Sequence, residues 1–368
     1  MNLVKSLVLV VICMSPLLVS AQDFKFKSLA EAKVTPVKSQ DRTGTCWAYS
    51  TISFIEAEIM KMGGPALNLS EMFIVKHAYD AKAKQYVLLH GMGNFSQGGQ
   101  AHDVTNVIDQ FGFVPEEDYY GKIDTSKMHN HSELASVMKV MLDDFMEQKN
   151  ASPSATWYSN ISSVSANYLG ELPDQVQFNK RTYSPVEFAK ALGIEKDNYI
   201  ELSSYNHHPF YKLFDLEVPD NWSHDRYYNL PIDELMKVMK ETLEAGYTFV
   251  WDGDVSEKFF SHKEGVALLP IDDSLGFVPQ KEQEVSQEGR QEAFYSWQAT
   301  DDHLMHIVGM AKDQNGTVYF KTKNSWGNKK NPYEGYLYMS EAYVRMNTVA
   351  IMLNKASLSK EVSKKLFK

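Results

Sequence analysis

The sequence has few cysteines, no excess of positive charge and only one long apolar run, and each shortage excludes a class of protein. Its two cysteines, Cys13 and Cys46, are too few for a disulfide framework and offer no pair with metal-ligand spacing. Acidic residues outnumber basic ones by 47 to 37, and a formal net charge of −10 argues against nucleic acid as the principal partner. We therefore expect no cofactor, no metal centre and no nucleic-acid partner.

The apolar run lies at the amino terminus, where residues 1–21 have the pattern of a secretory signal peptide. Lys5 supplies a positive charge, residues 7–14 are apolar, and residues 19–21 are of the small kind favoured at a cleavage site. A serine and a proline interrupt the run and leave it too short to span a membrane, and no other stretch is long enough. We expect cleavage after Ala21, no membrane span, and a secreted or periplasmic protein.

Cys46 stands where a loop of small and polar residues gives way to a helix. Apolar residues recur after it at helical spacing as far as Ile59, and a Gly-Gly-Pro sequence at 63–65 ends the helix. A thiol in the first turn faces unpaired N–H groups and the positive end of the helix dipole, which both favour thiolate. If Cys13 leaves with the signal peptide, Cys46 is the single cysteine of an exported chain. A free thiol is then better explained as a nucleophile than as a buried structural residue.

The segment from Gln40 to Ser50, Gln-Asp-Arg-Thr-Gly-Thr-Cys-Trp-Ala-Tyr-Ser, resembles the nucleophile segment of papain-like cysteine peptidases. Thr43 stands where papain has a disulfide cysteine, which points to the bleomycin hydrolase or aminopeptidase C branch. The resemblance implies that Cys46 is the nucleophile. It also implies that the Gln40 side chain and the Cys46 N–H hold the oxyanion.

Two later motifs resemble the same family. Residues 301–309 contain two candidate bases, His303 and His306, which a strand would direct to opposite faces. His303 begins the strand and matches the family pattern His-x-x-x-x-Val-Gly, so we choose it and expect His306 to be hydrogen-bonded on the other face. An Asn-Gly hairpin signal makes the next strand its neighbour. The Lys-Asn-Ser-Trp-Gly sequence after that strand implies that Asn324 orients His303 and that Trp326 shields their hydrogen bond.

Two other polar or flexible segments have weaker signals. The loop containing Gly98 and Gly99 is by itself only a turn. The resemblance implies that its backbone pairs with the main chain of a substrate, which glycine permits because no side chain blocks the approach. The adjacent His207 and His208 precede a proline and show no third ligand, so we interpret them as solvated polar residues.

The resemblance implies an α+β, papain-like fold of two lobes, a helical amino-terminal lobe and an antiparallel, β-barrel-like carboxy-terminal lobe. His303 lies farther from Cys46 than the ≈ 130–150 residues typical of papain itself, which indicates a helical insertion. We predict four segments, listed here in order: a signal peptide at 1–21, a helical lobe with the nucleophile at 22–120, a mainly helical insertion at 121–230, and at 231–368 a β-rich lobe with the histidine and asparagine and a short final helix.

These features predict a Cys-His-Asn peptidase that acts on peptides or proteins, of the aminopeptidase C or bleomycin hydrolase type. In that branch a carboxy-terminal arm lies in the cleft and its carboxylate selects free amino termini. Residues 357–368 form a lysine-rich helical pattern without the sequence of that arm. An open-cleft endopeptidase is therefore an alternative, the ring-like hexamer is in doubt, and a homo-oligomer is left open.

Two alternatives lie outside peptidase chemistry. A transglutaminase-like acyl transferase would orient its histidine with aspartate rather than with an Asn-Ser-Trp-Gly motif. A non-catalytic peptide-binding relative would have no need for the full set of Cys46, His303, Asn324 and Gln40.

Overall fold

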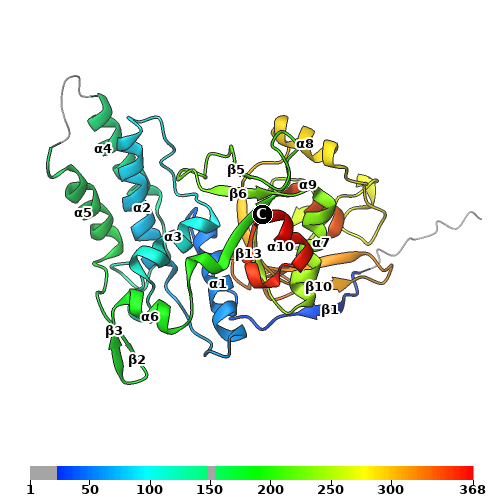
Figure 1. The fold of residues 1–368 in the computed structure, drawn as a ribbon, viewed down its shortest axis with the longest axis horizontal. Helices are drawn as coiled ribbons and strands as arrows, with labels where there is room; N and C mark the ends of the chain where they lie inside the picture. The colour runs from blue at the N-terminus through cyan, green and yellow to red at the C-terminus, as the bar shows by residue number, and fades with distance from the viewer. Residues whose placement is uncertain (1–22, 148–153, 368) are drawn as a thin grey trace, which may run out of the picture.

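A computed structural model describes residues 23–147 and 154–367 of the chain. Helices gather in one lobe and a large sheet with its own helices forms the other, with helix α1 (Cys46–Lys61) between them (Figure 1). The predicted signal peptide and its cleavage site lie outside the described residues and stay a prediction.

The helical lobe is formed by consecutive segments whose ends follow local sequence signals. Ser70 caps α2, since its Oγ accepts a hydrogen bond from the Phe73 N–H at 3.1 Å. Ser184 and Glu187 form a capping box around Pro185 at the start of α6. The lobe comprises α2 (Glu71–Leu88), α3 (Ala101–Phe111), α4 (Ser132–Glu147), α5 (Trp157–Leu169), the hairpin β2 (Val176–Phe178) and β3 (Arg181–Tyr183), and α6 (Pro185–Ala191).

The second lobe is built on one large sheet, in which β1 (Lys27–Glu31) pairs with β10 beside the main series of strands. The main series runs β5 (Leu213–Asp215), β6 (Arg226–Asn229), β4 (Tyr199–Ser203), β13 (Thr348–Asn354), β7 (Phe249–Gly253), β10 (His303–Lys312), β11 (Val318–Lys323), β12 (Tyr336–Ser340), β9 (Val266–Ala267) and β8 (Phe260–Ser261).

The prediction of an α+β fold with a helical first lobe is confirmed, but the sheet differs in detail from the expected antiparallel barrel. Within residues 23–147 and 154–367 the sheet does not close, because β5 and β8 remain as its two ends. Two neighbouring pairs, β4 with β6 and β9 with β12, are parallel. The sheet is therefore mixed and open.

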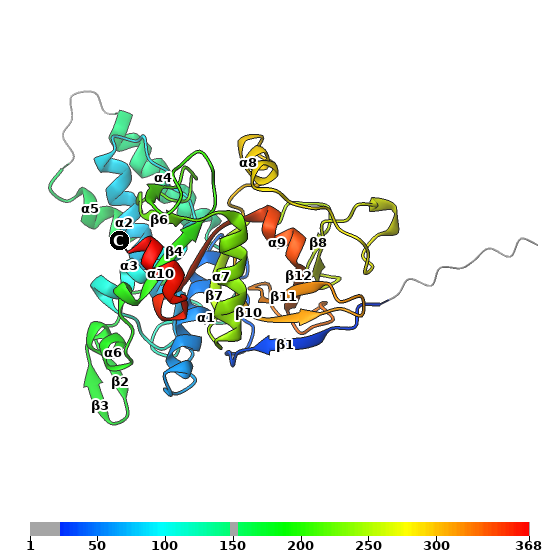
Figure 2. The ribbon, with the colours of Figure 1, turned by 45° about the vertical axis from the view of Figure 1, so that its right-hand side comes forward.

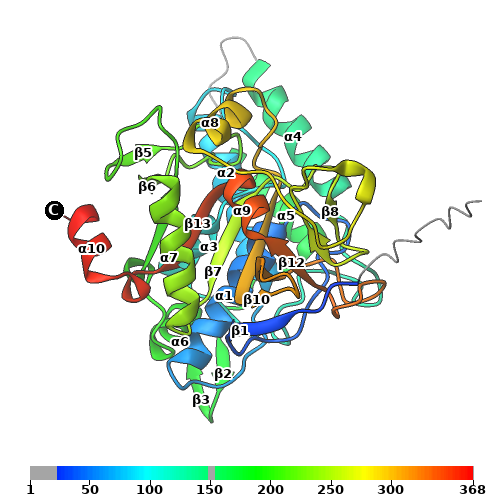
Figure 3. The same cartoon turned by 90° about the vertical axis from the view of Figure 1, so that its right-hand side faces the viewer.

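Further helices cover the face of the sheet that is turned away from α1. Figures 2 and 3 show α7 (Ile232–Glu244) lying across β7 and β10, and the buried side chains of α7 form one cluster with those of these strands. The remaining helical segments are α8 (Gln287–Tyr295), α9 (Glu341–Asn347), α10 (Lys360–Leu366) and the short turns η1 (Lys196–Asn198), η2 (Asp273–Leu275) and η3 (Lys355–Ser357). None of the helices in the described part of the chain combines the length and apolarity that crossing a membrane requires.

Alternation along β10 divides the core in two. Leu304 packs with α1 and the helical lobe, whereas Met305 and Ile307 pack with α7 on the other face. The helix α1 thus lies on one face of the sheet, with its first residue at the end of β10 where His303 lies. This arrangement brings the nucleophile segment to the histidine strand.

The segment predicted as an insertion contributes to both lobes. It contains α4, α5 and α6, and its last part forms β4, β5 and β6, which are hydrogen-bonded to the large sheet. The domain boundaries therefore stay predictions, while the structure shows that chain on both sides of residue 230 builds the same sheet.

Candidate active site

Cys46 is the first residue of α1 and is 8% exposed. Its Sγ accepts a hydrogen bond from the backbone N–H of Leu304, the residue after His303 on β10. As the first helical residue, Cys46 has a backbone N–H with no partner inside the helix. The thiol and an N–H that can bind an anion therefore point into the region where β10 begins.

His303 and Asn324 meet directly. The His303 Nε2 lies 2.8 Å from the Asn324 Oδ1, and both side chains are buried. Because the Ser325 N–H also donates to this oxygen at 2.7 Å, the oxygen is an acceptor and Nε2 carries the proton. The indole ring of Trp326 lies 4.8 Å from the imidazole, centroid to centroid. The unprotonated Nδ1 is left to accept a proton from a thiol.

The two histidines of β10 lie on opposite faces, as alternation predicts. His306 is fully buried against α1, where its Nδ1 lies 2.9 Å from the Ser53 Oγ. Burial and the nearby Lys323 ammonium hold the pKa of His306 well below its usual value. His306 is therefore a neutral, hydrogen-bonded residue, and His303 alone faces Asn324.

Gln40 connects the nucleophile loop to the asparagine motif. Its backbone N–H donates to the Ser325 carbonyl at 2.8 Å, and its Oε1 accepts from the Ser325 Oγ at 2.6 Å. One hydrogen of its Nε2 is donated to the Thr43 carbonyl at 2.6 Å, which leaves the second hydrogen of the amide. The side chain is thus fixed beside the loop that leads to Cys46, and its role in holding an oxyanion stays a prediction.

Burial opposes the charged forms of both Cys46 and His303. It raises the pKa of Cys46 to about 12, against the effect of the Leu304 N–H, and the charges of Asp220 and Asp252 raise the pKa further. It also lowers the pKa of His303 to about 4, against the hydrogen bond to Asn324. The thiolate that the sequence predicts stays a prediction. Burial opposes the charged form of each group, and the attraction between thiolate and imidazolium acts against it.

Acidic side chains of the protein approach Gly98 and Gly99 so closely that a larger residue at either position would clash with them. A Cβ on Gly98 would lie 1.8 Å from the Asp220 Oδ2, and a Cβ on Gly99 would lie 2.5 Å from the Asp103 Oδ2. The Lys82 ammonium donates to the Gly98 carbonyl. Pairing of these glycines with a substrate stays a prediction, and Asp220 lies directly against the first of them.

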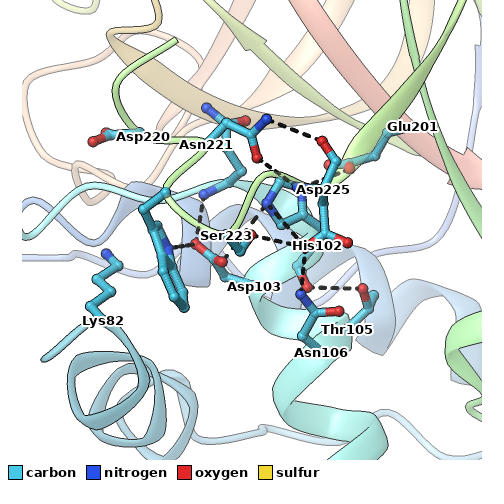
Figure 4. Close-up of polar contacts among 12 residues, drawn as sticks. Lys82, His102, Asp103, Thr105, Asn106, Glu201, Asp220, Asn221, Ser223 and Asp225 are labelled. Atoms are coloured by element: carbon cyan, nitrogen blue, oxygen red, sulfur yellow. Dashed lines mark hydrogen bonds and ion pairs between the residues drawn. The ribbon is translucent and has the colours of Figure 1, made fainter. Parts of the chain in front are cut away.

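The loop that carries Asp220 is fastened to α3 by a buried polar cluster, which Figure 4 shows. The Trp222 Nε1 donates to the Asp103 Oδ2 at 2.9 Å, and the His102 Nδ1 lies 2.7 Å from the Glu201 Oε2. Burial lowers the pKa of His102, but the charges of Glu201, Asp103 and Asp225 outweigh it and raise the pKa to about 9. A charged imidazole thus links α3 to β4 and to the loop.

The site contains groups that the sequence interpretation missed. Asp252 was detectable, since it interrupts the apolar strand sequence at 249–251 and charged residues seldom lie in buried strands. His262, whose Nδ1 lies 3.3 Å from the Asn324 Nδ2, and Asp220 carry no such local signal. Only the tertiary structure brings them to the nucleophile.

His207 and His208 do acquire the third group that the sequence did not show, because Glu217 lies within hydrogen-bonding distance of both. The Gln291 Oε1 accepts from the Asn206 N–H, so its Nε2 is the atom that faces the His207 Nδ1 at 3.0 Å. The Nε2 of His207 then carries a proton and donates to Glu217. These hydrogen bonds account for the arrangement of the three side chains.

The sequence was compared with models of known protein families. Residues 70–368 match the model of the Peptidase C1-like family, and this part of the chain contains His303 and Asn324. The chain belongs to the Peptidase C1-like family. The predicted resemblance and the predicted class, a cysteine peptidase acting on peptides or proteins, are thereby confirmed.

The sequence similarity to known relatives extends over nearly the whole chain. Bleomycin hydrolase from Mus musculus is 21% identical over 410 aligned residues, covering 95% of this chain and 87% of that protein. Aminopeptidase W from Lactobacillus delbrueckii subsp. lactis is 21% identical over 377 residues, covering 89% and 82% respectively. The crystal structure of PepW from Lactobacillus rhamnosis has a TM-score of 0.75 and 18% identity, covering 93% of this chain and 84% of that one. This last likeness confirms the fold.

Proposed function

We propose that this C1-like peptidase is an aminopeptidase that uses Cys46 as nucleophile, His303 as base and acid, and Asn324 as the residue that orients His303. One observation carries the proposal. The imidazole is fixed by Asn324 at 2.8 Å through Nε2, while the residue after it donates a backbone hydrogen bond to the Cys46 Sγ. Nucleophile, base and orienting group thus occupy one buried site.

The proposed reaction begins with transfer of the Cys46 proton to the His303 Nδ1. The sulfur attacks the peptide carbonyl carbon, and the oxyanion is held by the Cys46 N–H and the free hydrogen of the Gln40 amide. The imidazolium then protonates the amine as the C–N bond breaks, which leaves a thioester. A water molecule, deprotonated by His303, attacks the thioester and releases the acid and the thiol.

The aminopeptidase part of the proposal is supported by the relatives. Proteins named aminopeptidase W, G, E and C from two Lactobacillus species are 21–22% identical to this chain. Because identity at this level leaves specificity free to differ, the proposal needs a direct test of the amino terminus of the substrate.

The test compares hydrolysis of aminomethylcoumarin amides of one short peptide, with its amino terminus free and acetylated. We expect the wild-type protein to cleave the free form, and the Cys46→Ala protein to cleave neither because its nucleophile is lost. Equal cleavage of both forms would show an endopeptidase-like cleft. Full activity of the Cys46→Ala protein would contradict the mechanism.

We also propose that the protein is exported and cleaved after Ala21, since residues 1–21 have the pattern of a signal peptide. Amino-terminal sequencing of the mature protein tests this, with Gln22 expected as the first residue. Light scattering on the same material measures its assembly state.

A further inference from the structure

Three carboxyl groups from distant parts of the chain converge beside the nucleophile. Asp252 lies on β7, Asp301 lies two residues before the start of β10, and Asp220 lies in the loop between β5 and β6. The charges of Asp220 and Asp252 both raise the pKa of Cys46, and those of Asp301 and Asp220 raise the pKa of Asp252. The three carboxyl groups therefore lie near one another and near the thiol.

Of the three carboxyl groups, that of Asp252 has the fewest hydrogen bonds. It is 3% exposed, and among residues 23–147 and 154–367 neither carboxyl oxygen has a hydrogen bond of normal geometry, although the Gln100 side chain is near enough to lower its pKa. It pairs across the sheet with Leu304, so its side chain projects to the same face as that of Leu304, towards α1. A buried carboxylate with so little hydrogen bonding is costly, and a bound cation would offset that cost.

Asp220 is held in place so that one of its oxygens faces the glycine loop. Its Oδ1 accepts hydrogen bonds from the Asn94 Nδ2 at 3.0 Å and the Ser96 Oγ at 3.2 Å. Its N–H donates to the Asp301 Oδ2 at 3.3 Å, which connects two of the three acids. The other oxygen, Oδ2, points at Gly98 and has no hydrogen bond among residues 23–147 and 154–367. That oxygen is available to a ligand.

The Lys82 ammonium interacts with Asp220 and Cys46, but it is not among the groups with the largest effects on the pKa of Asp252 or Asp301. The Lys82 ammonium is held by the carbonyl groups of Ser96 and Gly98 and lies 5.2 Å from the ring of Trp47. Burial and other acids raise the pKa values of Asp252 and Asp301, and hydrogen-bond donors lower them. The pKa of Asp301 rises to about 7. The largest charge effects on Asp252 and Asp301 therefore come from other acids.

We propose that Asp252, Asp301 and Asp220 form a subsite that binds a cationic group of the peptide, next to the carbonyl that Cys46 attacks. An ammonium has three donors, and the oxygens of Asp252 and the Asp220 Oδ2 are free acceptors. The cation is either the free amino terminus of the substrate or a basic side chain on the acyl side. The inference rests on the proposed peptidase function, because the subsite adjoins the nucleophile of that reaction.

The experiment uses two pairs of coumarin amides, each with one cationic and one neutral member. One pair is acetyl-lysyl-alanyl and acetyl-norleucyl-alanyl amide, and the other is glycyl-alanyl amide with its terminus free or acetylated. We expect at least one cationic member to be preferred in kcat/KM. Asp252→Asn should remove about 10- to 100-fold of kcat/KM for that member and leave the neutral members unchanged, because a charged hydrogen bond is lost. Asp301→Asn should act in the same direction.

The matched control is Glu217→Gln, which removes an exposed acid from the loop that carries Asp220 and should change neither pair. A preference for the lysyl substrate identifies the side chain as the ligand, and a preference for the free terminus identifies the amino group. Equal rates within both pairs, or an Asp252→Asn variant that lowers all rates equally, would overturn the subsite.

Binding to the Cys46→Ala protein separates this inference from the proposed function. Calorimetry with the unlabelled dipeptide amides should show tighter binding of the cationic member, abolished when Asp252→Asn is added. Selective binding without hydrolysis by the wild-type protein would retain the subsite and contradict the peptidase. Hydrolysis without charge selectivity in binding or rate would retain the peptidase and contradict the subsite.

Discussion

The side chain of Asn324 determines which nitrogen of His303 carries the proton. Its Oδ1 receives two N–H groups, from His303 at 2.8 Å and from Ser325 at 2.7 Å, and this fixes the amide orientation. The same bond favours the imidazolium that forms when Cys46 loses its proton. Burial opposes that charge and lowers the pKa of His303 to about 4, so the hydrogen bond counts most during the reaction.

We expect Asn324→Ala to lower kcat by about 10- to 100-fold, because a hydrogen bond to a charged group is worth about 1.5–3 kcal/mol. KM should change little, since Asn324 holds the base. Steady-state kinetics of the peptide amide measures both. The exposed Asn328 belongs to the same loop, and Asn328→Ala should retain wild-type kinetics. Unchanged kcat in the Asn324→Ala protein would contradict its orienting role.

At the scale of elements, one buried ion pair fastens α3 to β4. His102 and Glu201 lie 2.7 Å apart and are both buried, and Asp103 and Asp225 add negative charge. The folded pKa of His102 is about 9, above its ordinary value of 6.5. The contribution of the pair to stability is therefore complete below pH 6.5 and is lost as pH rises through 9.

The double variant His102→Gln/Glu201→Gln tests this dependence, since it removes both charges together. Relative to the wild type it should lose about 3 kcal/mol of the free energy of unfolding at pH 6, and clearly less at pH 9.5. Denaturant titrations at the two pH values give the difference. The exposed pair His224 and Asp215, 2.9 Å apart, is the control, and the double variant His224→Gln/Asp215→Asn should change stability little at either pH. A loss that is the same at both pH values would refute the assignment.

At the scale of the whole molecule, two apolar cores lie on opposite faces of the sheet. One core joins α1 to the helical lobe and includes Leu304 of β10, and the other joins the sheet to α7 and includes Met305. Adjacent residues of one strand thus belong to different cores. Loss of packing far from the nucleophile should therefore reduce the stability of the whole fold.

Leu142 on α4 is fully buried, whereas Val140 on the same helix is 64% exposed. We expect Leu142→Ala to lower the free energy of unfolding by about 2–5 kcal/mol through loss of apolar contacts and the cavity left behind. Val140→Ala should change it by less than about 0.5 kcal/mol. Thermal unfolding followed by circular dichroism measures both, and equal effects would contradict the packing of α4.

The local sequence determined those features that depend on neighbours along the chain. Spacing and residue type determine the position of Cys46 at a helix start, the opposite faces of His303 and His306, the Asn-Gly hairpin and the serine caps at 70 and 184. The resemblance then identified Asn324, whose contact with His303 could not be derived from strand register. These predictions rest on short-range geometry, which the tertiary structure leaves intact.

The tertiary structure alone decided what depends on burial and on contacts between distant segments. It joined β4, β5 and β6 to the large sheet, although the sequence indicated a mainly helical insertion in this part of the chain. It also made that sheet mixed and open, where the sequence indicated an antiparallel, barrel-like one. It buried Cys46 and His303, which raises the pKa of the thiol and lowers the pKa of the imidazole, and no single helix end shows this desolvation. It also placed Asp220 against Gly98 and beside Asp252 and Asp301, which no local pattern connects, because the field at the nucleophile is the sum of charges that only folding brings together.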